Sequence, residues 1–244
     1  MPESSRTAGE VIFEEYLKSQ RISFEFEKEH PGKIKRPDYT IEWDAATVVF
    51  DVKDFDPPEK FPTGFGYADP YARIRKKIEQ GRDKFKQFKE YCCGLVLHNL
   101  GQPHVSLNEP DIMLGAMYGD PGFMFPVDTS TGVGDAGQVK RAFLDRGKMI
   151  RPDRSQPQNT TLSAIIVLMK IRPHLDLEFE VPRVIVWHNA FARISFPSNL
   201  FRGEYDTHVG IVHTENEVIE PAVTYEGNLV PNRLKLFKPR DANP

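Results

Sequence analysis

Two short runs of β-branched and aromatic residues constrain the fold of this chain more than any other feature. The first is YTIEW at residues 39–43 and the second is TVVFDVK at residues 47–53. Only residues 44–46 separate them, which is the spacing of a β-hairpin. The sequence therefore predicts two antiparallel strands joined by a tight turn.

The register of this hairpin decides which polar side chains meet. If the hairpin closes around Ala45, Tyr39 pairs with Asp51, whereas a slip by one residue places Asp38 opposite Lys53. Directly opposed β-carbons lie about 5 Å apart, and diagonal neighbours lie about 7 Å apart. Both registers therefore predict that Asp38 lies near Asp51 and Lys53.

The acidic and basic residues of the second strand fall on one side of the sheet. Side chains alternate along a strand, so Asp51 and Lys53 share a face, and Val52 points the other way. Two carboxylates, from Asp38 and Asp51, can reach one hard cation such as Mg2+, with Mn2+ as a substitute. Such a site suits phosphodiester hydrolysis, with Lys53 orienting the attacking water or the phosphate.

An amphipathic helix is predicted before the hairpin, over residues 7–19. Thr7 is a plausible N-cap, and Glu10 stands three positions later, as in a capping box. If this helix packs beside the hairpin, Glu10 could supply a further carboxylate to the cation, and Glu14 is the rival one turn on. The residues expected to point inward include Val11, Tyr16 and Leu17.

A second helix is predicted after the hairpin, beyond a loop over residues 54–70. From Tyr71 onward the apolar side chains recur at helical spacing, and the lysines and arginines fall on the outer side. Residues 71–90 contain eight Lys or Arg and three Asp or Glu, so the local charge is strongly positive. The run GLVLHN then predicts the next strand. The inward positions of the helix are Ile74, Ile78, Phe85 and Phe88.

The remainder of the chain divides by composition. Residues 1–100 form the predicted α/β core, and residues 101–160 are a loop-rich insertion with one helix at 135–146. Residues 161–244 contain several short strand-like runs broken by proline and glycine, which indicates a β-rich extension packed on the core.

Bulk composition excludes some classes of protein. The net charge is -3 and the pI is near 6.2, so the chain has no overall positive field, and any nucleic-acid binding must be local. No apolar run approaches the roughly 20 residues needed to cross a bilayer, and the first residues lack a signal-like stretch. We expect a cytoplasmic protein without a membrane partner.

Three sequence features together resemble the PD-(D/E)xK, or restriction-endonuclease-like, nuclease superfamily. They are Pro37-Asp38, a gap of 12 residues, and Asp51-Val52-Lys53, all preceded by an acidic helix. The resemblance covers roughly residues 7–99. It implies a restriction-endonuclease-like α/β core, with a mixed central sheet flanked by helices, to which the β-rich C-terminal extension is added.

The resemblance also implies roles for particular residues. In Holliday-junction resolvases a helix glutamate precedes the hairpin, and its offset favours Glu10 over Glu14. Members often carry a glutamine or lysine near the site on the following helix. Here the candidates for that position are Gln80, Lys84 and Gln87, and Arg73, Lys76 and Lys77 are further candidates for substrate contacts.

The function that follows is a Mg2+-dependent endonuclease acting on DNA rather than RNA, in restriction, defence or repair. The alternative is a non-catalytic nucleic-acid-binding or assembly module that keeps the nuclease fold. Cutting both strands of a duplex with this type of site usually requires two copies, so a homodimer is expected.

Overall fold

The computed structural model describes residues 6–56, 69–101, 105–135, 137, 140–143, 146–151, 156–172, 180–213 and 219–226. Its helices are α1 (Ala8–Ser19), α2 (Ala72–Phe85) and α3 (Pro110–Tyr118). The first five strands are β1 (Glu25–Phe26), β2 (Tyr39–Trp43), β3 (Ala46–Phe55), β4 (Cys92–Asn99) and β5 (Pro121–Met124). The others are β6 (Lys140–Phe143), β7 (Leu162–Ile171), β8 (Val181–His188), β9 (Thr207–His213) and β10 (Ile219–Glu226).

Within this part of the chain, eight strands form one mixed sheet. The order across the sheet is β1-β2-β3-β4-β7-β8-β9-β10, and β5 and β6 form a separate hairpin. β3, β4 and β7 are mutually parallel, whereas β2 and β8 pair antiparallel to their inner neighbours. The chain therefore has the expected mixed α/β architecture with few helices, and β7 to β10 belong to the same sheet as the hairpin.

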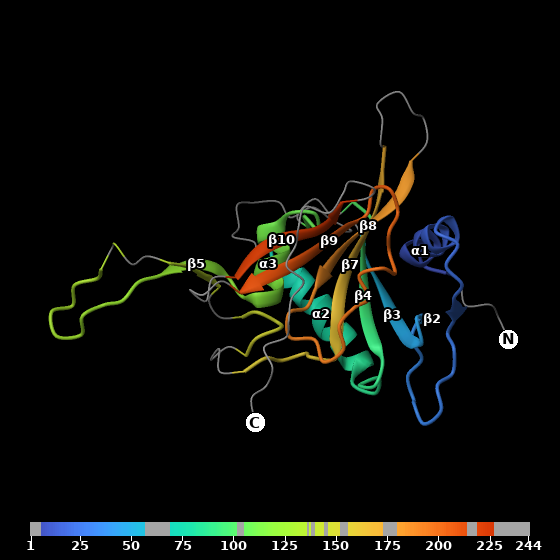
Figure 1. Cartoon of the computed structure of the whole chain (residues 1–244), viewed down its shortest axis with the longest axis horizontal. Coiled ribbons are helices and arrows are strands. Elements are labelled where there is room, and N and C mark those ends of the chain that lie inside the picture. The colour runs from blue at the N-terminus through green and yellow to red at the C-terminus, as the bar shows by residue number, and fades with distance from the viewer. Residues whose placement is uncertain are drawn as a thin grey trace.

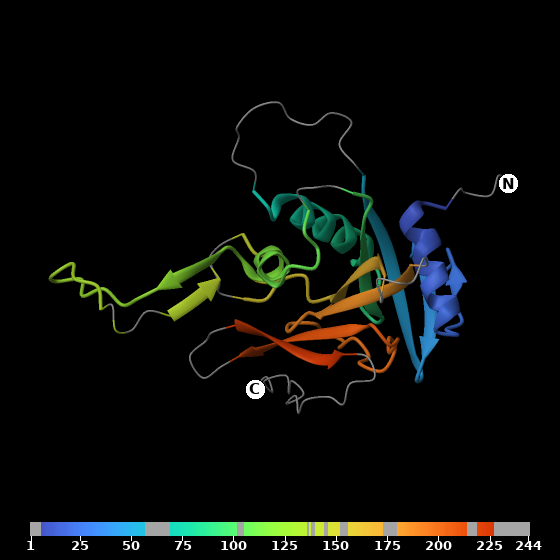
Figure 2. The ribbon, with the colours of Figure 1, turned by 90° about the horizontal axis from the view of Figure 1, so that it is seen from above.

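Helices cover the two faces of this sheet (Figures 1 and 2). α1 packs Phe13, Tyr16 and Leu17 on one face, where they meet alternate residues of the central strands. α2 and α3 pack on the other face, over the residues between those. Parallel strands covered on both sides read as nearly continuous apolar runs, as β4 and β7 do.

The two predicted helices around the hairpin are present. Thr7 caps α1, with the reciprocal bonds of a capping box to Glu10. The α2 stripe of Ile74, Ile78 and Phe85 is fully buried, as predicted, and so is Phe88, which lies three residues beyond the end of the helix. Tyr16 and Leu17 are also buried, but the inward position expected for Val11 is wrong, because that side chain is 43% exposed on the outer side of α1. Phe13 faces the sheet in its place.

The hairpin has neither of the two predicted registers. β2 and β3 pair Tyr39 with Phe50 and Trp43 with Ala46, so the turn contains two residues. Both of them, Asp44 (φ 46) and Ala45 (φ 64), adopt left-handed conformations. Two-residue turns of that hand match the twist of the flanking strands, which explains why the shorter closure is adopted.

The insertion after β4 differs from its prediction. The helix expected over residues 135–146 is wrong, since residues 140–143 form β6, which pairs with β5. The helix of this region is α3, with Pro110 in its first turn. Its last six residues are buried, so it shows no polar stripe that would mark it as a surface helix. Figures 1 and 2 show the β5–β6 hairpin extending away from the sheet.

Candidate active site

The hairpin brings Asp38 beside Asp51. The Asp38 N–H donates to the Phe50 carbonyl at 2.9 Å, one residue out of step with the β2–β3 register, in which Phe50 pairs with Tyr39. The Asp38 side chain turns back onto the partner strand, where Oδ2 accepts a hydrogen bond of 2.7 Å from the Val52 N–H. Its other carboxylate oxygen, Oδ1, therefore remains for a different partner.

Asp51 and Lys53 share a face of β3, as strand alternation requires. The Asp51 side chain is completely buried and that of Lys53 is 27% exposed. Lys53 Nζ lies 2.9 Å from both carboxylate oxygens of Asp51 but donates a hydrogen bond only to Oδ1. Among the described residues Asp51 Oδ2 has no hydrogen-bond donor, although no solvent reaches it.

Lys84, which is on α2 and not on the hairpin, binds both carboxylates. α2 follows β3 and lies on the same face as Asp51, where Phe85 anchors its last turn in the core. Lys84 Nζ donates to Asp51 Oδ1 at 2.6 Å and also contacts Asp38 Oδ1. One cation is therefore held between the two acids, and the cluster contains two carboxylates and two ammonium groups.

Burial changes the protonation equilibria in this cluster. Burial and, after it, the charge of Asp51 raise the pKa of Asp38 to about 6, against the opposing effects of Lys84 and the Val52 hydrogen bond. Burial also acts to lower the pKa of Lys84, but the charges of Asp51 and Asp38 outweigh it and raise that pKa above its usual value. The ammonium of Lys84 therefore stays charged, whereas ionising Asp38 beside the charge of Asp51 in a buried place costs free energy.

The donor set of this cluster fits a divalent cation in two respects. Asp38 and Asp51 already converge on one cation, the ammonium of Lys84. Asp51 Oδ2 is a buried anionic oxygen that accepts no hydrogen bond from the described residues, and with only the Lys53 ammonium beside it at 2.9 Å it can still bind a further donor or cation. Two carboxylates leave further coordination positions for water and a phosphate oxygen, as Mg2+ prefers.

The third carboxylate expected from α1 is not part of this cluster. Glu10 Oε2 accepts the Thr7 N–H at 2.7 Å, since the capping box uses this carboxylate. Glu14 bonds Arg6 at 2.8 Å and the Tyr39 hydroxyl at 3.1 Å. α1 packs on the sheet face opposite α2, so neither glutamate joins Asp38 and Asp51. Over the described ranges, no three His, Cys, Asp or Glu side chains are grouped to hold a metal ion.

The three candidates predicted on the second helix have different positions, and Gln87 lies just beyond the end of α2. Lys84 binds both acids, whereas Gln87 Oε1 accepts the Ile34 N–H at 2.7 Å and fixes the loop before the hairpin. Gln80 lies one turn before Lys84 and lines a cleft of about 220 Å³. This cleft lies where β3 ends and α2 begins, and its lining residues are Asp54, Phe55, Asp56, Arg73, Lys76, Lys77 and Gln80.

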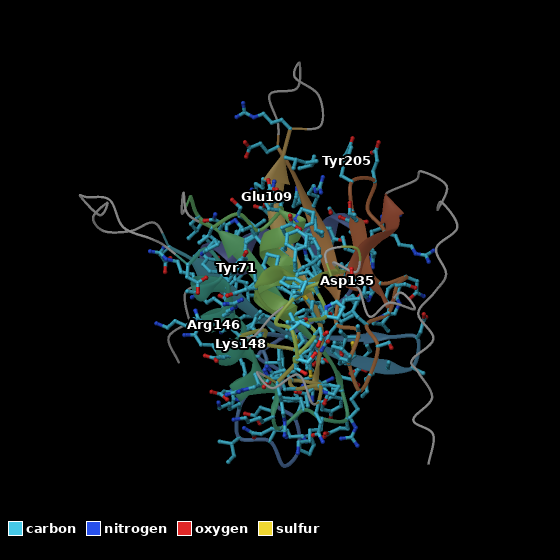
Figure 3. The ribbon with its side chains drawn as sticks, turned by 90° about the vertical axis from the view of Figure 1, so that its left-hand side faces the viewer. Tyr71, Glu109, Asp135, Arg146, Lys148 and Tyr205 are labelled. Carbon is cyan, nitrogen blue, oxygen red and sulfur yellow. The ribbon has the colours of Figure 1, made fainter. Side chains whose placement is uncertain are left out.

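Another side of α2 is tied to the rest of the protein. Arg75 is buried, contacts Asp120 and donates to the Gly115 carbonyl at 2.8 Å, so its charge is neutralised inside the fold. Lys148 contacts Glu79, and Figure 3 shows Lys148 and Arg146 together on the same side of the molecule as Tyr71. The basic α2 residues that line the cleft, Arg73, Lys76 and Lys77, take no part in these two contacts.

A second acid, the partly buried Asp54, lies three residues after Asp51 but on the other face of β3. Its Oδ2 accepts the Gly9 N–H at 3.1 Å, and its Oδ1 lies 3.0 Å from His98 Nδ1. A β-carbon at Gly9 would overlap Asp54 Oδ1, so the close approach of α1 to β3 requires glycine there. Asp54 thus joins α1, β3 and β4, and it is no ligand of the Asp38–Asp51 cluster.

Comparison with protein-family models, with curated proteins and with solved structures gave no match. None of the helices in the described ranges has the length and apolar character required to cross a lipid bilayer.

Proposed function

We propose that this protein is a Mg2+-dependent nuclease that hydrolyses phosphodiester bonds in DNA. The observation that carries the proposal is the convergence of Asp38 and Asp51 on one cation, with the ammonium of Lys53 beside them. The order of these residues, Pro37-Asp38 followed by Asp51-Val52-Lys53, also resembles the PD-(D/E)xK signature. A restriction-endonuclease-like core belongs to the same proposal.

Each residue of the cluster has a role in this chemistry. Asp38 and Asp51 would hold the Mg2+ ion through Asp38 Oδ1 and the buried oxygens of Asp51. The ion, when bound, would lower the pKa of a water molecule and neutralise charge that develops on the phosphate. Lys53 is partly exposed, so its ammonium can donate to a phosphate oxygen or to the attacking water while it stays near Asp51.

The surroundings of the cluster support a polyanionic substrate. α2 supplies Arg73, Lys76, Lys77 and Gln80 to the cleft, and these side chains suit contacts with backbone phosphates. The overall charge of the protein is negative, so such binding would be confined to this side of α2. DNA rather than RNA, a role in restriction, defence or repair, and a homodimer follow from the resemblance and the mechanism.

One observation favours a second function. Lys84 occupies the position between Asp38 and Asp51 that the metal ion requires, and no third carboxylate reaches it from the described residues. If the Lys84 ammonium stays bound to Asp38 and Asp51, no metal ion binds there, and the protein would be a nucleic-acid-binding or assembly module without cleavage.

Cleavage assays on the purified chain distinguish these two functions. Supercoiled plasmid and single-stranded DNA are incubated with Mg2+ or with EDTA, beside Lys53→Ala and the control Lys86→Ala. Lys86 directly follows α2 and pairs with Asp83 at the surface. We expect cleavage by the parent and by K86A with Mg2+ only, and loss of cleavage with retained DNA binding in K53A. Equal cleavage with EDTA would contradict the metal mechanism, and DNA binding without cleavage in any divalent cation would favour the module.

A further inference from the structure

Lys84 is bound differently from the other lysine of the cluster. Lys53 Nζ lies 2.9 Å from both oxygens of a single carboxylate, that of Asp51. Lys84 Nζ instead bridges two carboxylates, at Asp51 Oδ1 and Asp38 Oδ1. Only Lys84 therefore lies where a cation shared by both acids must be.

The charge of the cluster does not accommodate an additional cation as it stands. Two ammonium groups balance two carboxylates, so a divalent ion added to all four would leave a net charge of +2 in a largely buried site. Like charges in a region of low dielectric repel strongly. Departure of Lys84 would free Asp38 Oδ1 and leave Asp51 Oδ1 with Lys53 alone as its donor, whereas departure of Lys53 would free no oxygen on Asp38.

The helix offers Lys84 another location. Arg73, Lys77, Gln80 and Lys84 follow one another at intervals of four, three and four residues, so they form one row along α2. The first three of them line the cleft. The lysine side chain has four methylene groups joined by rotatable bonds, so a displaced ammonium can extend toward solvent beside this row.

We propose that Lys84 is an internal counter-ion that holds Asp38 and Asp51 together until a divalent cation displaces it, and that the released ammonium then joins the α2 row that contacts substrate phosphates. This inference rests on the proposed function for the identity of the substrate. The competition between Lys84 and the metal ion is independent of whether the protein cleaves DNA. Because the ammonium must leave before the metal ion binds, Lys84 weakens the affinity of the resting protein for the metal.

Metal affinity measures this competition directly. Mn2+ is titrated into the full chain by isothermal titration calorimetry, for the parent, Lys84→Met, Lys84→Gln and the control Lys86→Met. We expect both Lys84 variants to bind Mn2+ more tightly by about 10-fold, or about 1.4 kcal/mol, because the competing cation is removed. K86M removes a charge at the end of the same helix without touching either acid, so its affinity should stay close to that of the parent.

A second measurement uses the parent protein and does not depend on how well the variants fold. Lysine side-chain 15N NMR identifies the Lys84 ammonium as the signal that is missing from K84Q, and Mg2+ is then added to saturation. We expect this signal to move to the position of a solvated ammonium. A signal that stays unchanged when Mg2+ is bound, unchanged or weaker Mn2+ binding by folded Lys84 variants, or no metal binding by any of the proteins would each overturn the inference.

The same data separate this inference from the proposed function. If K84M binds Mn2+ more tightly but the parent never cleaves DNA, the displacement of Lys84 by the metal ion is supported and the nuclease function is contradicted. If the parent cleaves DNA with Mg2+ but K84M binds Mn2+ with the affinity of the parent, the nuclease function is supported and the displacement of Lys84 is contradicted.

Discussion

β3 carries two acids, the buried Asp51 and the partly buried Asp54, whose surroundings differ although only two residues separate them. Asp54 faces α1 and is held by the Gly9 N–H and by His98, both of which belong to elements packed against it. Asp51 faces α2, and over the described residues its partners are the ammonium groups of Lys53 and Lys84. One of its oxygens has no hydrogen bond.

This difference distinguishes a carboxylate that holds the fold from one that can exchange its partner. A backbone N–H such as that of Gly9 cannot leave without local unfolding, so it fixes Asp54 in place. An ammonium on a flexible stem can leave at the cost of its ion pair alone. Burial acts to raise the pKa of Asp54, but the hydrogen bonds from His98, Gly9 and Thr7 outweigh it and lower that pKa below its usual value.

The largest expected effect comes from removing the charge of Asp51. We expect Asp51→Asn to reduce Mg2+-dependent DNA cleavage by on the order of 100-fold to 1,000-fold, because one of two anionic ligands is lost. Asp54→Asn should retain most of the cleavage activity, since Asp54 lies on the other face of β3. Plasmid-cleavage rates measured for both variants under one set of conditions test this contrast.

A check of folding belongs with that experiment. The circular dichroism spectrum of D51N should match that of the parent, because Lys84 keeps its contact with Asp38 and the Lys53 side chain is 27% exposed, so its ammonium can turn to solvent. Equal losses of activity in D51N and D54N would show that the two acids do not differ as their partners indicate.

For the free energy of unfolding we expect the opposite order, with a larger effect from substitution of Asp54 than of Asp51. Asp54→Ala leaves the Gly9 N–H and the His98 ring without their acceptor in a buried place. We expect it to lower the free energy of unfolding by about 2 to 3 kcal/mol, the cost of stranding buried donors. Urea denaturation of D54A and Asp51→Ala measures this, and a smaller loss in D54A than in D51A would contradict the structural role of Asp54.

The parts of the fold that follow from local periodicity could be read from the sequence. The alternation in residues 39–53 and the stripe of Ile74, Ile78 and Phe85 each required only neighbouring residues. α3 could not be recognised in this way, because its last six residues are buried and it has no polar stripe. The pairing of β7 with β4 joins residues about seventy positions apart, which no local pattern encodes.

The candidate site was readable to the extent that it lies on the hairpin. Asp51 and Lys53 share a face in any register, and Asp38 stays near them. The structure does not bring Glu10 to the two acids, and the reason was visible in the sequence, since the capping box with Thr7 uses the same carboxylate. Lys84 could not be separated from Gln80 and Gln87, because that choice depends on how α2 is rotated against β3.

The pH dependence of stability gives a third contrast, between Asp38 and Asp54. The folded pKa of Asp38 is raised to about 6, above the unfolded value of about 3.9, so between these values the folded state binds more protons. The contribution of Asp38 to stability therefore falls as the pH rises through this window. The pKa of Asp54 is lowered, so its contribution has the opposite sign: it is present above the unfolded pKa and is lost as the pH falls through the folded pKa.

Asp38→Asn isolates this effect. Relative to the parent, D38N should gain on the order of 1 to 2 kcal/mol of unfolding free energy between about pH 4.5 and about pH 7.5, because only the parent must ionise a buried acid. The Asn side-chain oxygen can still accept the Val52 N–H, so the ladder is preserved. Urea denaturation across this range measures the gain, and a constant difference between the two proteins would contradict it.

The smallest expected effect concerns the turn that places Asp38 beside Asp51. Ala45 has a φ of 64°, a left-handed conformation that costs a residue with a β-carbon about 1 to 2 kcal/mol. Ala45→Gly removes this cost but increases the entropy of the unfolded chain, so we expect a net stabilisation of about 0.5 to 1 kcal/mol. Ala46→Gly is the matched control, because Ala46 begins β3 and glycine there should be destabilising. Thermal unfolding of the two variants tests this expectation. Stabilisation by A46G, or destabilisation by A45G, would mean that the hairpin closes in another register than the pairing of Tyr39 with Phe50 that places Asp38 beside Asp51.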